Sequence, residues 1–167
     1  MILGSAWTQS PQAVINSSKR SFFMLHEYQS AQLLYKYMIP IPLGTVAFSA
    51  KEAFVVGRKF GPDYNGQFVV KAQVHGNART KGVFRENGFK SGIHICNTID
   101  EVRDVTDRMV GKHLVLPGAL NEQGLMCNSV LVMEHLKIDK QFFLMINYDR
   151  KTGQPCITYS DVGGLSY

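Results

Sequence analysis

The chain has 167 residues, of which 45% are hydrophobic and 19% are charged, and this composition excludes a disordered protein. The length predicts one domain, or two small lobes that share a core. The net charge of +5 is scattered without a run of five basic residues, so it supports nucleic-acid binding only weakly. No apolar run approaches the roughly 20 residues that a membrane-spanning helix needs.

The first segment, residues 1–23, contains no Asp or Glu, but it carries Lys19, Arg20 and several serines. A basic, serine-rich, acid-free N-terminus is typical of an organelle transit peptide, and a disordered leader is the alternative. In either case we expect the folded domain to comprise residues 24–167.

Apolar residues at helical spacing predict a first helix over 25–38, and a short strand is expected at 43–48. A second helix begins after Ser49, because Glu52 three positions later completes a capping box. We expect this helix to end at Gly61, a typical C-terminal signal.

The middle of the chain predicts a strand over 67–74, a glycine-containing loop over 76–82 and another strand over 92–96. A second capping box, Thr98 with Glu101, opens a third helix.

The last part of the chain predicts strands over 128–136, 141–150 and 156–160, the last two forming a hairpin. The whole order of helices and strands indicates an α/β or α+β fold.

The cysteines, Cys96, Cys127 and Cys156, are odd in number and widely spaced. This spacing argues against a disulfide framework and predicts reduced, mostly buried thiols. None of the five histidines has the spacing of a metal site.

Lys71 lies between Val70 and Ala72, in a strand with apolar residues on both sides. An unpaired buried ammonium group is costly, so this lysine needs an anionic partner. Two partners are open: an acidic side chain such as Glu134, or the phosphate of a ligand.

The loop from Gly76 to Gly82 favours the phosphate. Glycines allow backbone N–H groups to approach an anion, and Arg79 and Lys81 add charged donors. The loop matches neither the P-loop nor the GxGxxG pattern, so a solvated surface turn is the alternative. The segment from Glu134 to Gln141 is either a polar strand connection or a nucleotide hinge that contacts base and ribose.

An ordered set of motifs resembles a known family. The stretches "LHEYQSAQLLYKYMIPIPLG", "VVKAQVH", "KGVF", "GFKSGIHI", "MVGKHLV" and "SDVGGLSY" resemble the N-terminal, ATP-grasp part of the succinyl-CoA synthetase (succinate–CoA ligase) beta subunit. The resemblance runs from residue 24 to 167. It implies the N-terminal lobes of an ATP-grasp fold, incomplete in this chain.

The resemblance also implies site residues, position by position. The family's phosphate-contacting lysine falls on Lys71, its hinge carboxylate on Glu134 and a later nucleotide-facing glutamate on Gln141. Its loop, usually AGGRGKG, is replaced here by the sequence GNARTKG. The nucleotide-binding residues implied in this way are Lys71, Ala78, Arg79, Thr80, Lys81, Glu134 and Gln141.

The activity that the resemblance implies is an acid–thiol ligase of the tricarboxylic acid cycle. The family interconverts succinate, CoA and a nucleoside triphosphate with succinyl-CoA, the diphosphate and phosphate. The implied ligand is ATP or GTP with Mg2+, whose protein ligands are expected beyond Tyr167. The implied partner is the alpha subunit, and the implied location is the mitochondrial matrix or a related organelle. No nucleic-acid or membrane partner is expected.

Two functions remain open on the sequence alone. The chain is either the nucleotide-binding part of such a beta subunit, not active by itself, or an inactive truncated paralogue with a binding or structural role.

Overall fold

The computed structural model describes residues 24–60, 66–76, 79–118 and 123–163. The predicted leader, the predicted helix end at Gly61 and the site residue Ala78 lie outside these ranges. The elements in chain order are α1 (Glu27–Lys36), β1 (Gly44–Ala47), α2 (Ala50–Arg58), β2 (Phe68–Ala72), the 3-10 turn η1 (Arg79–Lys81), β3 (Val83–Phe84), β4 (Ile93–Cys96), α3 (Ile99–Met109), β5 (Lys112–Val115), β6 (Leu125–Cys127), β7 (Val130–Glu134), β8 (Phe143–Tyr148) and β9 (Pro155–Ser160).

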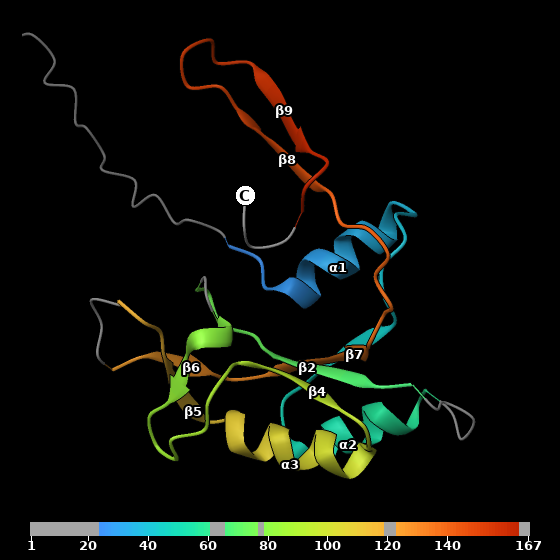
Figure 1. The fold of residues 1–167 in the computed structure, drawn as a ribbon, viewed down its shortest axis with the longest axis vertical. Helices are drawn as coiled ribbons and strands as arrows, with labels where there is room; N and C mark the ends of the chain where they lie inside the picture. Colours follow the sequence, from blue (N-terminus) through green and yellow to red (C-terminus); the bar gives the residue numbers. More distant parts are fainter. Residues whose placement is uncertain (1–23, 61–65, 77–78, 119–122, 164–167) are drawn as a thin grey trace, which may run out of the picture.

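The largest sheet has four antiparallel strands in the order β1-β7-β2-β4. Figure 1 shows α2 and α3 against one face of this sheet and α1 on the opposite side. The neighbouring strands within the described sheets are all antiparallel, so the fold belongs to the α+β alternative of the predicted class.

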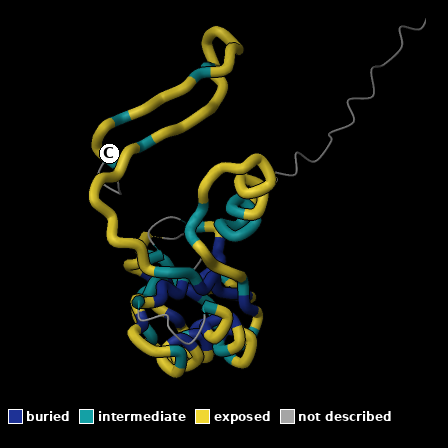
Figure 2. The backbone as a smooth tube through the Cα atoms, turned by 90° about the vertical axis from the view of Figure 1, so that its right-hand side faces the viewer, coloured by how far each residue is buried: buried dark blue, intermediate teal, exposed yellow. Residues whose placement is uncertain are grey.

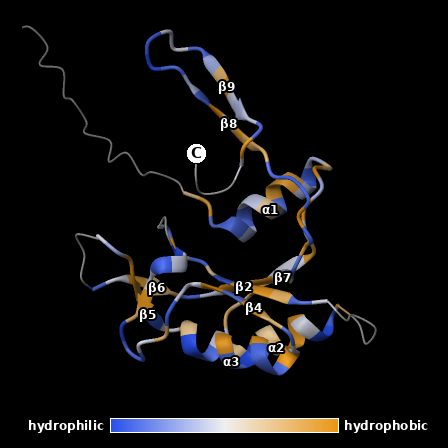
Figure 3. Cartoon of the chain, in the orientation of Figure 1, coloured by the Kyte–Doolittle hydropathy of each residue, from blue (hydrophilic) through white to orange (hydrophobic). Residues whose placement is uncertain are grey.

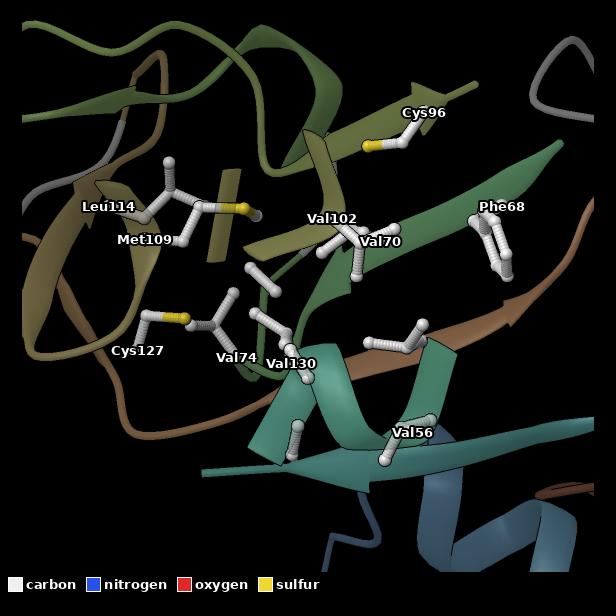
Figure 4. Close-up of a cluster of buried hydrophobic side chains, with 14 of the residues drawn as sticks. Val56, Phe68, Val70, Val74, Cys96, Val102, Met109, Leu114, Cys127 and Val130 are labelled. Atoms are coloured by element: carbon white, nitrogen blue, oxygen red, sulfur yellow. The ribbon is translucent and has the colours of Figure 1, made fainter. Parts of the chain in front are cut away.

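The two faces of the four-stranded sheet differ in character. Phe68, Val70 and Ala72 of β2 belong to the buried core shared with α2 and α3 (Figure 4). Successive side chains of a strand point to opposite faces, so Lys71 points away from this core toward α1. The strand can hold a cation because its second face lies outside the main core cluster, although Val69 and Leu131 on that face are also buried.

One half of each predicted capping box is present at the helix starts, while the Glu52 and Glu101 carboxylates accept from the backbone N–H groups of Phe48 and Asn97, one residue before the cap. The backbone N–H of Glu52 donates to Ser49 Oγ at 3.2 Å, and that of Glu101 donates to Thr98 Oγ1 at 3.1 Å. Each satisfies a backbone donor that the first helical turn leaves without a partner.

A second, three-stranded sheet, in the order β3-β5-β6, was not predicted. These strands have two to four residues, too few for the period of two to become visible in the sequence. Gly111, at a φ of +76°, makes the turn from α3 into β5, a conformation that residues with a side chain rarely adopt.

The predicted hairpin is present as β8 and β9. One of its faces is formed by the apolar pairs Leu144 with Tyr159 and Ile146 with Ile157. All four side chains are exposed, and Figures 2 and 3 show the hairpin standing away from the buried part of the protein. Within the described ranges, no helix is long and apolar enough to cross a membrane.

The prediction of reduced, mostly buried thiols is confirmed. Cys96 and Cys127 are buried, Cys156 is half-buried, and all three are free. Burial raises the pKa of the Cys96 thiol and of the Cys127 thiol to about 11. These two residues therefore act as small apolar core residues.

Candidate functional site

Two cations meet at one carboxylate on the α1 side of the sheet. Lys71 Nζ lies 2.8 Å from Glu27 Oε1, and Arg79 Nη2 lies 2.9 Å from Glu27 Oε2. The lysine and arginine side chains are each 21% exposed, and the glutamate side chain is 35% exposed. The cluster is thus partly buried yet open to solvent.

Both the side chain and the backbone of Arg79 are held by hydrogen bonds. Its guanidinium donates through Nη1 to the carbonyl oxygen of Ala72 at 2.7 Å, which ties it to the end of β2. Its own carbonyl accepts from the backbone N–H groups of Gly82 and Gly92. A Cβ on Gly92 would lie only 3.3 Å from that carbonyl oxygen, so a glycine suits this close approach.

The charge of Glu27 follows from its neighbours. Burial acts to raise the pKa of this carboxyl group, but hydrogen bonds from Lys71 and Arg79, together with their positive charges, outweigh burial. The pKa of Glu27 therefore lies below its ordinary value, and the group is an anion at neutral pH.

The start of α1 is docked on the residues that follow β2. The backbone N–H of Tyr28 donates to Gln73 Oε1 at 3.3 Å, and Gln73 Nε2 donates to the Lys71 carbonyl. The rings of His26 and His75 stack with centroids 3.9 Å apart. Burial, followed by the charges of His75 and Arg79, lowers the pKa of His26, so this imidazole favours its neutral form.

A pocket of about 210 Å³ lies between α1 and the sheet, beside the ionic cluster. Glu27 and Lys71 provide its charged end, and Ile41, Leu131 and Met133 are among its apolar walls. A site with an apolar wall and a few converging charged groups is typical of small-molecule binding.

Gly44 forms part of the same pocket and allows β1 to approach β7 closely. A Cβ at this position would lie 2.7 Å from Met133 Cβ and 3.0 Å from the Val132 carbonyl oxygen. The absence of a side chain thus shapes the pocket floor.

The structure brings two of the predicted site residues together, Lys71 and Arg79. Thr80 and Lys81 lie in the same 3-10 turn as Arg79, and both side chains are exposed. Their contact with a nucleotide stays a prediction, as does that of Ala78, which the structure does not describe.

Lys71 pairs with an acidic side chain, as one of the two alternatives predicted, but the partner is Glu27 and not Glu134. Glu134 Oε1 accepts from the backbone N–H of Leu43 at 2.8 Å, and its own N–H donates to the Leu43 carbonyl. The carboxylate thereby fixes the segment that leads into β1, next to the pocket wall at Pro42 and Gly44. Its contact with a base stays a prediction.

Gln141 does not line the pocket that Lys71 lines. It is exposed ahead of β8, in a shallow depression that also includes Asp139 and Asp161. Its carbonyl accepts from the backbone N–H of Gly163 at 3.1 Å. A nucleotide contact through its side chain stays a prediction.

Sequence reasoning missed Glu27, Gln73 and His75 as parts of the site. The one available signal was the energetic cost of an unpaired Lys71, which required a nearby anion. No spacing rule joins a residue in the first helix to one 44 positions later in a strand.

Comparison with protein families identifies the class of this domain. A family model described as the ATP-grasp domain matches residues 24–166, and the chain belongs to this family. The predicted resemblance and fold class are thereby confirmed.

Curated relatives indicate which members of this family the chain is similar to. The chain is 39% identical over 144 residues to "Succinate--CoA ligase [GDP-forming] subunit beta, mitochondrial" of Dictyostelium discoideum, covering 86% of this chain and 33% of that protein. It is 37% identical to the ADP-forming subunit beta of Blastocystis sp. subtype 1, covering 84% and 34%. It is 31% identical to the hydrogenosomal ADP-forming subunit beta of Neocallimastix frontalis, covering 92% and 34%. The chain spans about a third of the length of these curated relatives.

Proposed function

We propose that this chain is the nucleotide-binding part of a succinate–CoA ligase beta subunit, in which Lys71 and Arg79 bind the phosphates. The observation that carries the proposal is the convergence of these two cations on one point beside an apolar pocket. Polyphosphates are recognised by charged donors of this kind, and arginine can bind two oxygens at once.

In the proposed complex, the nucleotide's phosphates lie at the charged end of the pocket and its base lies toward the apolar walls. The relatives include GDP-forming and ADP-forming enzymes, so both GTP and ATP are candidate ligands. The reaction of the whole protein would couple succinate and CoA to cleavage of the triphosphate, a step that the resemblance implies belongs to the tricarboxylic acid cycle.

The metal ion and the protein partner are further parts of the proposal. Among the described residues there is no group of three His, Cys, Asp or Glu side chains that could hold a metal ion. An alpha subunit is the proposed partner, and the proposed location is a mitochondrion or related organelle, since some relatives are named mitochondrial or hydrogenosomal.

An inactive paralogue with a binding or structural role is the second candidate. One observation favours it: Glu27 already pairs with both cations, and its single negative charge offsets one of their two positive charges. The loop also carries Asn77, Ala78 and Thr80 where the family usually has other residues, and each adds a Cβ or larger group near the expected phosphates.

Thermal unfolding with MgATP or MgGTP separates the two candidates. A ligand at a hundred times its dissociation constant stabilises the folded state by about 2.7 kcal/mol. We expect such a shift in the wild type and its loss in Lys71→Met, which keeps an unbranched side chain but removes the charge. The matched control is Lys151→Met, which makes the same change at an exposed residue after β8.

The absence of a shift with either nucleotide would favour the second candidate. A shift that persists in Lys71→Met would mean that the phosphates bind elsewhere.

A further inference from the structure

Glu27 occupies the place where an anionic ligand would meet Lys71 and Arg79. Each of its two oxygens takes one cation, at 2.8 and 2.9 Å. Two oxygens of one phosphate group could make the same pair of contacts, because carboxylates and phosphates bind such cations in similar geometry. The carboxylate and a phosphate therefore compete for the same two donors.

The helix that carries Glu27 is docked mainly through polar groups. None of the residues of α1 is buried, and several of its large apolar side chains are exposed, among them Leu33, Leu34 and Tyr35. The described contacts at its start are the ionic cluster, the 3.3 Å bond from Tyr28 to Gln73 and the stacking of His26 on His75. Moving this helix would leave the core on the other face of the sheet intact.

The pocket volume is a second observation in line with a site that α1 partly fills. With Glu27 and Tyr28 forming part of the wall, the pocket holds about 210 Å³. Binding sites for drug-sized ligands and cofactors usually have about 300–1,000 Å³. The space enclosed beside α1 is smaller than this range, so α1 limits how much of a nucleotide the pocket can enclose.

We propose that Glu27 is a built-in competitor that closes the phosphate site in the free chain, and that a phosphate-bearing ligand displaces its carboxylate and shifts α1. The inference rests on the proposed function for the identity of the ligand, but not for the competition itself. The apparent affinity for phosphates is then reduced by the fraction of molecules in which the site is closed.

Calorimetric titration of wild type and Glu27→Gln with two probes tests this inference. The probes are tripolyphosphate, which carries only the anion, and MgATP. We expect Glu27→Gln to bind tripolyphosphate about tenfold more tightly than the wild type, as removal of a closed state predicts. Asp104→Asn on α3, across the sheet, makes the same change of charge and should leave the affinity unaltered. Glu27→Ala also removes the carboxylate and serves as a second variant if Glu27→Gln folds poorly. It should bind tripolyphosphate with the same increase in affinity.

The two probes separate the two proposals. Tighter binding of tripolyphosphate by Glu27→Gln than by the wild type supports the competition. If MgATP binds no more tightly than tripolyphosphate, that second result contradicts the proposed nucleotide function but not the competition. Unchanged, weaker or undetectable tripolyphosphate binding in both Glu27 variants overturns the competition. In that case MgATP binding by the wild type would leave the proposed function standing.

Discussion

The coupling between Lys71 and Glu27 is measurable as a double-mutant cycle with Lys71→Met and Glu27→Gln. A hydrogen bond to a charged group contributes about 1.5–3 kcal/mol when it is well shielded, and exposed ion pairs contribute only about 0.2–1 kcal/mol. The side chains here are 21% and 35% exposed, so the pair lies between these limits. We expect a coupling free energy of about 1 kcal/mol, or a shift in midpoint temperature of roughly 2–4 °C.

Urea unfolding of the four proteins at low and high salt provides the assay. The coupling should fall at 1 M salt, where the Debye length is about 3 Å, compared with about 10 Å at 0.1 M. The control cycle is Arg103 with Asp100 on α3, a pair at 3.1 Å whose side chains are 47% and 70% exposed. A Lys71–Glu27 coupling no larger than the control coupling would refute the claim that the cluster holds α1 to the sheet.

Four further outcomes follow from the structure. Gly44→Ala should destabilise the fold by about 1–3 kcal/mol in urea, because its Cβ would lie 2.7 Å from Met133 Cβ; an unchanged midpoint contradicts the close approach. Ser49→Ala and Thr98→Ala should each cost about 1 kcal/mol, since each removes the acceptor of a capping bond; circular dichroism melting measures the loss. A thiol reagent at mildly alkaline pH should label Cys156 first, because Cys96 and Cys127 are buried and the pKa of each is raised to about 11; equal labelling rates of all three would contradict their burial. The pKa of Glu27 lies below its ordinary 4.5. The ionised carboxylate therefore contributes its full stabilisation above pH 4.5, and this contribution is lost as the pH falls through the lower pKa of the folded state. In acid titrations followed by unfolding, Glu27→Gln should lose less stability with falling pH than the wild type does.

The elements that were predictable from the sequence are those with local causes. The starts of α2 and α3 follow from Ser49 with Glu52 and from Thr98 with Glu101, three positions apart in each case. The hairpin of β8 and β9 likewise follows from neighbouring strand patterns. Here the signal and the structure lie within one short window of the chain.

The features that were not predictable depend on contacts between distant segments. β5 pairs with β3 on one side and β6 on the other, and none of the three is long enough to show a period. The alternation of side chains along β2 predicted that Lys71 and Val70 lie on opposite faces of the sheet. It did not predict which of the two faces packs against α1.

The site shows the same division between local and distant causes. The sequence indicated that Lys71 requires an anion, and it named Arg79 as a second cation near it. It did not identify Glu27, since the choice between Glu27 and Glu134 is made by the packing of α1 and by the bond from Leu43 to Glu134.

A structure of the chain determined with MgATP or MgGTP bound tests the central claim most directly. The account predicts phosphate oxygens within about 3 Å of Lys71 Nζ and of the Arg79 guanidinium, with the Glu27 carboxylate displaced from both. A nucleotide bound elsewhere, with the contacts of Glu27 to Lys71 and Arg79 unchanged, would contradict it.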